Sequence, residues 1–173
     1  WQESGHGDIN LTSGITYSCD VVFYEIGKGF YYAESPEGMQ ETFRSYGLGA
    51  VSGIDLNGEA AGRVPDAEWK QSYFKELGYS DEDSSWKGGD NCNIAIGQGD
   101  MLVTCLQMAD AYCSIANRGP IWRPHVLKGV RSKVGEGFVS EYRVEQLANV
   151  EEEQSYRDIV ERGMWGVIYE ESP

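Results

Sequence analysis

Residues 8–32 read DINLTSGITYSCDVVFYEIGKGFYY, a short polar triplet between two apolar runs. An apolar helical pattern leads into Ser18-Cys19-Asp20, and a second one follows from Val21. The stretch therefore predicts two helices, over residues 11–17 and 21–32, with a polar break that can present its side chains to a cleft. Asp20 can instead cap the second helix, and local sequence favours that role because aspartate is a preferred N-cap residue.

The composition of the 173-residue chain is that of one globular domain, or of one large piece of one. The net charge of -14 argues against binding to nucleic acid or to an anionic membrane surface. No apolar run approaches the roughly 20 residues of a membrane span, and no signal peptide is visible. Because the chain begins abruptly at Trp1 and stops at Pro173, we expect an excised piece of a longer protein.

The cysteines and histidines show no pattern typical of a metal site. Cys19, Cys92, Cys105 and Cys113 form no C-x-x-C pair, so we expect no zinc site, no other metal and no cofactor. Cys105 and Cys113 would be about 12 Å apart along one helix, too far for a disulfide. We expect both to be small buried apolar residues. For His6, which lies between two glycines, a structural role is favoured over that of a ligand or base.

Glycine and proline divide the middle of the chain into helices and loops. Proline at the first helical position predicts a helix over residues 36–46, which should end at the glycines that follow. Residues 51–63 are rich in glycine and should be irregular. A short helix is expected over residues 65–78. Residues 79–93 are polar and predict an exposed loop; its acidic run Asp81-Glu82-Asp83 could bind a cation, but a solvated loop is favoured.

The clearest helix follows Thr104. Thr104 and Gln107 match the capping box, in which each side chain binds an amide at the helix start. Gly119 and Pro120 should end this helix. The expected buried stripe consists of Cys105, Ala109, Tyr112, Cys113 and Ala116.

The last third of the chain predicts a hairpin and a final helix. Residues 122–131 and 137–143 read as two strands, the first weakened by Pro124. Asn149 can cap the last helix, with residues 151–153 in its first turn, where glutamates suit the helix dipole. The expected buried face of that helix consists of Tyr156, Ile159, Val160, Gly163, Met164 and Val167.

Two short matches to S-x-x-K are the only candidates for nucleophilic chemistry that the residues offer by themselves. Ser72 precedes Lys75, and Ser84 precedes Lys87; on a helix this spacing places a lysine one turn from a serine hydroxyl. The pattern is short and arises often by chance, so a surface role is favoured for both. No K-T-G, no G-x-S-x-G and no P-loop occurs in the chain.

Four segments together resemble the transpeptidase domain of class B penicillin-binding proteins. The most specific part is AIGQG followed by a T-x-L-Q helix, and S-C-D followed by VFYEIG resembles the elongation type more than the division type. The order and spacing match the family over nearly the whole chain. The segments are GHGDINLTSGITYSCDVVFYEIG, YGLGAVSGIDLNGEAAGRVPDAEWK, NIAIGQGDMLVTCLQMADAYCSIANRGPIWRPH and VERGMWGVI.

The resemblance implies a serine D,D-transpeptidase as the parent protein. In this family a serine of S-x-x-K attacks the D-Ala-D-Ala end of a peptidoglycan stem peptide, and β-lactams acylate the same serine. The second motif, S-x-N or S-x-D, supplies a serine for proton transfer and a polar group that orients the substrate. Ser18 and Asp20 match these positions, and are therefore the candidate catalytic residues. Expected partners are stem peptides and cell-wall synthesis proteins. The expected location is the extracytoplasmic face of the bacterial cell membrane, to which an N-terminal segment absent from this sequence would anchor the parent.

The departures from the family pattern indicate a fragment. The family's S-x-x-K precedes the second motif, so Ser72 and Ser84 are decoys, and K-T-G would follow residue 173. Cys105 replaces the family's usual proline after the threonine, which should weaken the helix start slightly. Residues 1–173 would then be a partial transpeptidase domain with one of three catalytic motifs, and should not acylate alone.

The expected fold is mostly α with a small β element, the helical part of a penicillin-binding-protein or β-lactamase-like domain with its central sheet largely missing. Exposed apolar surface should then favour self-association. The main alternative is a non-catalytic relative that acts as a β-lactam sensor or as a scaffold. An unrelated helical binding module is a weaker alternative.

Overall fold

The computed structural model describes residues 5–134 and 137–170. The chain divides into two compact units. Unit 1 comprises Trp1–Thr42, Val64–Met101 and Glu152–Pro173, and unit 2 comprises Phe43–Arg63 and Leu102–Glu151. None of the helices within the described ranges is both long and apolar enough to cross a membrane.

The regular secondary structure in the described part of unit 1 is entirely helical. Its helices are α1 (Leu11–Thr16), α2 (Asp20–Tyr31), α4 (Ala67–Glu76), α5 (Asp81–Ser84), α6 (Gly88–Ala95) and α8 (Gln154–Tyr169), while α3 (Gly38–Ser45) spans the boundary between the units. The prediction of two helices around the polar triplet is confirmed. The third helix begins at Gly38, two residues later than expected.

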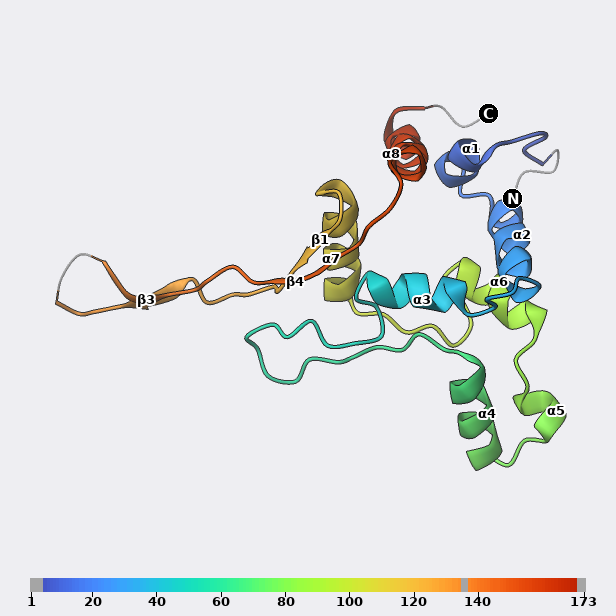
Figure 1. Ribbon diagram of the computed structural model, residues 1–173, viewed down its shortest axis with the longest axis horizontal. Helices are drawn as coiled ribbons and strands as arrows, with labels where there is room; N and C mark the ends of the chain where they lie inside the picture. Colours follow the sequence, from blue (N-terminus) through green and yellow to red (C-terminus); the bar gives the residue numbers. More distant parts are fainter. Residues whose placement is uncertain (1–4, 135–136, 171–173) are drawn as a thin grey trace. The chain divides into compact units, whose positions relative to one another are not determined.

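Helices α1 and α2 each pack on a partner from a distant part of the sequence. Figure 1 shows α1 beside α8, and α2 beside α6. The Asn91 side chain of α6 is 0% exposed; its amide donates to the Gly27 carbonyl of α2 at 3.1 Å, and its oxygen accepts from the Trp86 indole at 2.6 Å. The buried Lys70 of α4 pairs with Asp90 of α6 at 2.7 Å. Buried polar side chains thus link α6 to both α2 and α4 within unit 1.

The predicted exposed loop over residues 79–93 is wrong, since α5 and α6 occupy most of it. Ser80 caps α5 by accepting from the Asp83 amide at 3.2 Å. Asp90 closes the first turn of α6, because its carboxylate accepts from the Lys87 amide at 2.7 Å. The acidic run Asp81-Glu82-Asp83 forms the first turn of α5, where the helix dipole favours negative charge.

Unit 2 contains α7 (Cys105–Ala116) and two two-stranded antiparallel ladders. β1 (Pro120–Trp122) pairs with β4 (Gln146–Asn149), and β2 (Gly129–Arg131) pairs with β3 (Phe138–Glu141). The predicted hairpin is confirmed at β2 and β3. The predicted long strand over 122–131 is wrong, because the chain leaves the ladder after Trp122, close to Pro124.

The predicted capping box of α7 is confirmed, but its predicted buried stripe is wrong. Thr104 and Gln107 bind each other's amides at 3.1 and 2.9 Å. Gln107 is 2% exposed, and its amide donates to the carbonyls of Ala50 and Ala61 at 2.6 and 2.7 Å, which fixes the irregular segment 51–63. The buried face of α7 is Gln107, Ala111 and Ser114, whereas all five residues of the predicted stripe are exposed, with Tyr112 at 51%.

The last helix also differs from the prediction at its start and on its face. Asn149 lies in β4, and α8 begins at Gln154 with Glu153 as its N-cap, so the predicted asparagine cap is wrong. Residues 151–153 precede the helix instead of forming its first turn. The buried residues are Arg157, Gly163 and Gly166; Gly163 is the one member of the predicted set among them, and Tyr156 and Val167 are exposed.

The fold class predicted from the sequence is confirmed: helices form most of the regular secondary structure in the described residues, and their β structure is limited to short strands in small ladders.

Candidate functional site

Ser18 occupies a backbone conformation that a side chain normally avoids. It follows the end of α1 with φ of +50°. Its amide donates to the Ile15 carbonyl at 3.2 Å, and the Cys19 amide donates to the Gly14 carbonyl at 2.9 Å. These two bonds form the Schellman turn that ends many helices, in which glycine usually holds the left-handed position. A serine at this position is strained, and such strain tends to occur at functional sites.

Asp20 is the first residue of α2, and the preceding Cys19 is its N-cap. The prediction that Asp20 caps the helix is therefore wrong. Its carboxylate lies in the first turn, where the positive end of the helix dipole favours negative charge. Ser18 and Asp20 are both exposed. Within the described ranges, the Ser18 hydroxyl and the Asp20 carboxylate make no hydrogen bond. Both are thus available to a ligand.

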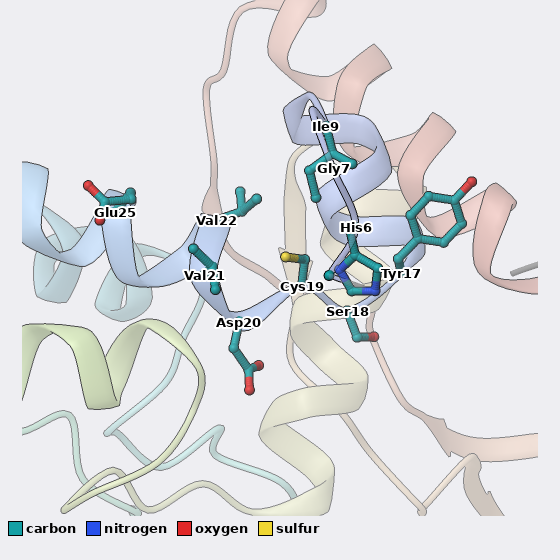
Figure 2. Close-up of a pocket in the computed structure, with 11 residues that line it drawn as sticks. His6, Gly7, Ile9, Tyr17, Ser18, Cys19, Asp20, Val21, Val22 and Glu25 are labelled. Carbon is teal, nitrogen blue, oxygen red and sulfur yellow. The ribbon is translucent and has the colours of Figure 1, made fainter. Parts of the chain in front are cut away.

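A cavity of about 960 Å³ opens beside this turn. Ser18 and Asp20 line it together with apolar side chains such as Ile9 and Val21. Figure 2 shows Ser18 and Asp20 projecting from the same connector, while the sulfur of Cys19 turns to the other side. A mostly apolar cavity with a few convergent polar groups is typical of a ligand site.

A second cavity, in unit 2, is much smaller, at about 110 Å³. Asp110 lines it beside Gln107. Burial raises the pKa of the Asp110 carboxyl, and the nearby charge of Glu59 raises it further. This cavity is too small for a peptide, so the larger one is the candidate site.

The two S-x-x-K matches lie away from the candidate cavity. Ser72 is exposed on α4, and its partner Lys75 pairs with Asp81 at 3.0 Å. Ser84 is buried at the end of α5, where its hydroxyl donates to the Ser80 carbonyl at 2.7 Å. Neither serine lines the large cavity.

His6 lines the same cavity as Ser18, with its ring centroid 5.9 Å from that of Tyr17. Across the described ranges, no three or more His, Cys, Asp or Glu side chains are grouped so that they could hold a metal ion. All four cysteines are free thiols. Cys19 is buried, but Cys105 and Cys113 are exposed, so the prediction that these two are buried is wrong.

Sequence comparison finds clear relatives. The family described as "Penicillin binding protein transpeptidase domain" matches residues 1–167. The peptidoglycan D,D-transpeptidase MrdA of Haemophilus influenzae is 32% identical over 138 residues, which is 80% of this chain and 19% of that protein. The chain thus spans about a fifth of the length of this curated relative.

Solved structures show the same similarity. PBP2 of Pseudomonas aeruginosa, in complex with WCK 5153, matches with a TM-score of 0.72 and 27% identity, over 98% of this chain and 34% of that one. PBP2 of Helicobacter pylori, in complex with MreC, matches with a TM-score of 0.71 and 28% identity, over 98% of this chain and 28% of that one.

Proposed function

Since this chain belongs to the penicillin-binding-protein transpeptidase family, we propose that it is part of a peptidoglycan D,D-transpeptidase that cross-links stem peptides in cell-wall synthesis. The resemblance to class B proteins of the elongation type is confirmed by the MrdA relative and the PBP2 structures. The match to PBP2 structures over 98% of the chain also confirms the fold as part of a transpeptidase domain.

The observation that carries this proposal is the strained Ser18 at the edge of the large cavity, with Asp20 beside it. In the proposed reaction a serine outside this chain attacks the carbonyl of the penultimate D-alanine. The lysine of the same S-x-x-K takes the proton of that serine, Ser18 relays a proton from this lysine to the leaving amine, and the bond to the terminal D-alanine breaks. Asp20 orients the peptide. The amine of a neighbouring stem then attacks the acyl-enzyme and forms the cross-link, and the proton that this amine loses returns through Ser18 and the lysine to the serine oxygen that leaves.

The proposal assigns to this chain the middle of the domain, with the S-x-x-K and K-T-G segments supplied by flanking parts of the parent protein. The decoy role of Ser72 and Ser84 fits their positions, since one is exposed on α4 and the other donates to a backbone carbonyl. We therefore expect that fluorescent penicillin will not label this chain in isolation. Covalent labelling of Ser72 or Ser84 would contradict that expectation.

The decisive experiment substitutes the second motif in the full-length parent. Ser18→Ala should lower the acylation rate constant for a fluorescent penicillin by about 100-fold, the usual contribution of a group that transfers a proton. Asp20→Ala should lower it by a similar factor, because the substrate loses a group that orients it. Ser72→Ala is the matched control and should acylate at the wild-type rate. A wild-type rate for Ser18→Ala would remove the proposed role of the turn.

PBP2 of Helicobacter pylori forms a complex with MreC. We propose by analogy that the parent of this chain works with cell-wall synthesis proteins that maintain cell shape, at the extracytoplasmic face of the membrane. A parent gene without an S-x-x-K upstream of this segment would favour a β-lactam sensor or scaffold instead.

A further inference from the structure

Helix α8 approaches α1 more closely than side chains would allow. A Cβ atom on Gly163 would lie 2.7 Å from the Ile15 Cβ and 3.0 Å from the Thr12 carbonyl oxygen. A Cβ atom on Gly166 would collide with the hydroxyl of Thr16. Both glycines are buried. The bare backbone of α8 is therefore the surface on which α1 rests (Figure 1).

One side chain connects the two helices through a hydrogen bond. The Thr16 hydroxyl lies 3.1 Å from the Thr12 carbonyl of its own helix and 3.1 Å from the Gly163 carbonyl of α8. Thr16 is 9% exposed, so water does not compete effectively for this hydroxyl. Because Gly163 has no side chain, its carbonyl is accessible to a residue on the neighbouring helix.

Thr16 is the last residue of α1, and the turn begins directly after it. The two turn bonds use the carbonyls of Gly14 and Ile15, both on α1. The position of Ser18 therefore depends on the position of the end of α1. A helix of six residues is too short to hold itself in place, so its position comes from packing.

We propose that Thr16, through its hydrogen bond to the Gly163 carbonyl, is a positioning residue for the catalytic turn. Gly163 and Gly166 form the surface of α8 on which Thr16 packs. This proposal rests on the proposed function of Ser18. Proton transfer requires a distance close to 3 Å, and a displacement of about 1 Å can cost on the order of 100-fold in rate. A hydroxyl two residues before Ser18 can set that distance without touching the substrate.

The test measures two quantities in the full-length parent: the acylation rate constant for a fluorescent penicillin, and the fraction of protein labelled at completion. Thr16→Val removes the hydroxyl but keeps the shape, and Thr16→Ser keeps the hydroxyl. We expect Thr16→Val to lower the rate constant by about tenfold or more, while Thr16→Ser stays within about twofold of wild type. A purely structural role would lower the labelled fraction and leave the rate constant of the folded molecules unchanged, which would overturn the proposal.

A pair of substitutions distinguishes the effect of the Thr16 hydrogen bond from the effect of packing between Thr16 and Gly166. Gly166→Ala places a methyl group against the Thr16 side chain and should slow acylation, because α1 must move. Adding Thr16→Ala removes the two atoms closest to that methyl group and leaves only the Cβ of residue 16, at 3.2 Å. A double variant that stays slow supports the role of the hydrogen bond, and a double variant with the wild-type rate constant overturns it.

Ser18→Ala in the same assay distinguishes this proposal from the proposed function. A slow Ser18→Ala with a normal Thr16→Val removes only the positioning role. A normal Ser18→Ala removes both. A slow Ser18→Ala, a slow Thr16→Val and a normal Thr16→Ser support both.

Discussion

The two helices that flank Ser18-Cys19-Asp20 are held by similar contacts at different distances from the turn. On one side α1 rests on glycines of α8, and Thr16 supplies the hydrogen bond. On the other side Gly27 of α2 rests on α6, and Asn91 supplies the hydrogen bond. Both contacts combine a missing side chain with a buried polar group that binds a backbone carbonyl.

The two contacts differ in the atoms that face the glycine, which are backbone in one case and mainly side chain in the other. They also differ in the length of the helix that they hold in place. A Cβ on Gly27 would meet backbone atoms of α6 and would lie 2.7 Å from the Asn91 backbone carbonyl oxygen. The helix that carries Gly27, α2, has 12 residues. A Cβ on Gly163 would meet mainly the Ile15 side chain, and α1 has 6 residues. The α2 contact should therefore contribute more to stability, and the α1 contact more to the geometry of the turn.

The largest effect on stability is expected for Gly27→Ala. The added methyl group cannot avoid the α6 backbone, so we expect a loss of about 3 kcal/mol, at the upper end for overpacking. Thermal melting of the full-length parent measures it. In molecules that remain folded, the acylation rate constant should change little, since Gly27 lies seven residues beyond Asp20. If the free energy that corresponds to the loss in acylation rate constant exceeds the loss of folding stability, the α2 contact does not act mainly on stability.

A smaller loss of stability but a larger loss of rate is expected for Gly163→Ala. The short helix α1 can shift to accommodate the methyl group, which limits the cost to about 1–2 kcal/mol. The same shift carries Ser18 with it. The ratio of rate loss to stability loss, measured by penicillin acylation and thermal melting on one preparation, should exceed that of Gly27→Ala. Equal ratios would mean that the two contacts are equivalent.

Opposite effects on stability and activity are expected for Ser18→Gly. Glycine adopts the positive φ without strain, so this variant should be more stable than Ser18→Ala by about 1 kcal/mol. Both variants lack the hydroxyl and should acylate equally slowly. The difference between their melting temperatures checks the strain, and their shared rate checks the role of the hydroxyl. Equal melting temperatures would show that the turn is unstrained.

The smallest effect is expected for Gly29→Ala, which serves as the control for alanine in α2. A Cβ at Gly29 meets no atom within 4 Å. The substitution should stabilise the protein by about 0.5 kcal/mol, because alanine favours the helix over glycine. Thermal melting compares it directly with Gly27→Ala. A destabilised Gly29→Ala would show that alanine itself, rather than the collision with α6, harms the helix.

Local signals predicted the elements whose stability is local. The helices around the polar triplet and the Thr104 capping box follow from periodicity and cap chemistry, and both occur in the structure. The same signal occurs at α5, because Ser80 and Asp83 have the spacing of a capping pair, whereas the acidic run favours a loop. Cap spacing is thus more informative than charge in that segment.

Burial was harder to predict because polar residues fill much of the interior. Gln107 is buried since its amide binds two carbonyls of the segment 51–63 and its flank, and Ser114 is buried since its hydroxyl binds the Gly119 carbonyl at 2.9 Å. Apolar periodicity cannot find such residues. In α8 the close contact depends on Gly163 and Gly166, which carry no side chain to form an apolar stripe.

Family resemblance identifies the candidate site, because S-x-D alone carries little information. The structure adds the conformation of Ser18 and the cavity beside it, neither of which can be read from the sequence. It also adds Thr16, whose partner Gly163 lies 147 residues away in the chain. No local pattern predicts a hydrogen bond over that separation.

The unequal exposure of the four thiols makes the turn observable without any substrate. Cys105 and Cys113 are exposed and should react with a maleimide at once, whereas Cys19, between Ser18 and Asp20, is buried. Cys19 is 8% exposed, so it should react more slowly, and its rate should rise when the ends of α1 and α2 separate. The labelling rate of Cys19 relative to that of the exposed thiols then reports how often the turn opens. Thiol labelling therefore measures the motion of the turn that carries the Ser18 hydroxyl.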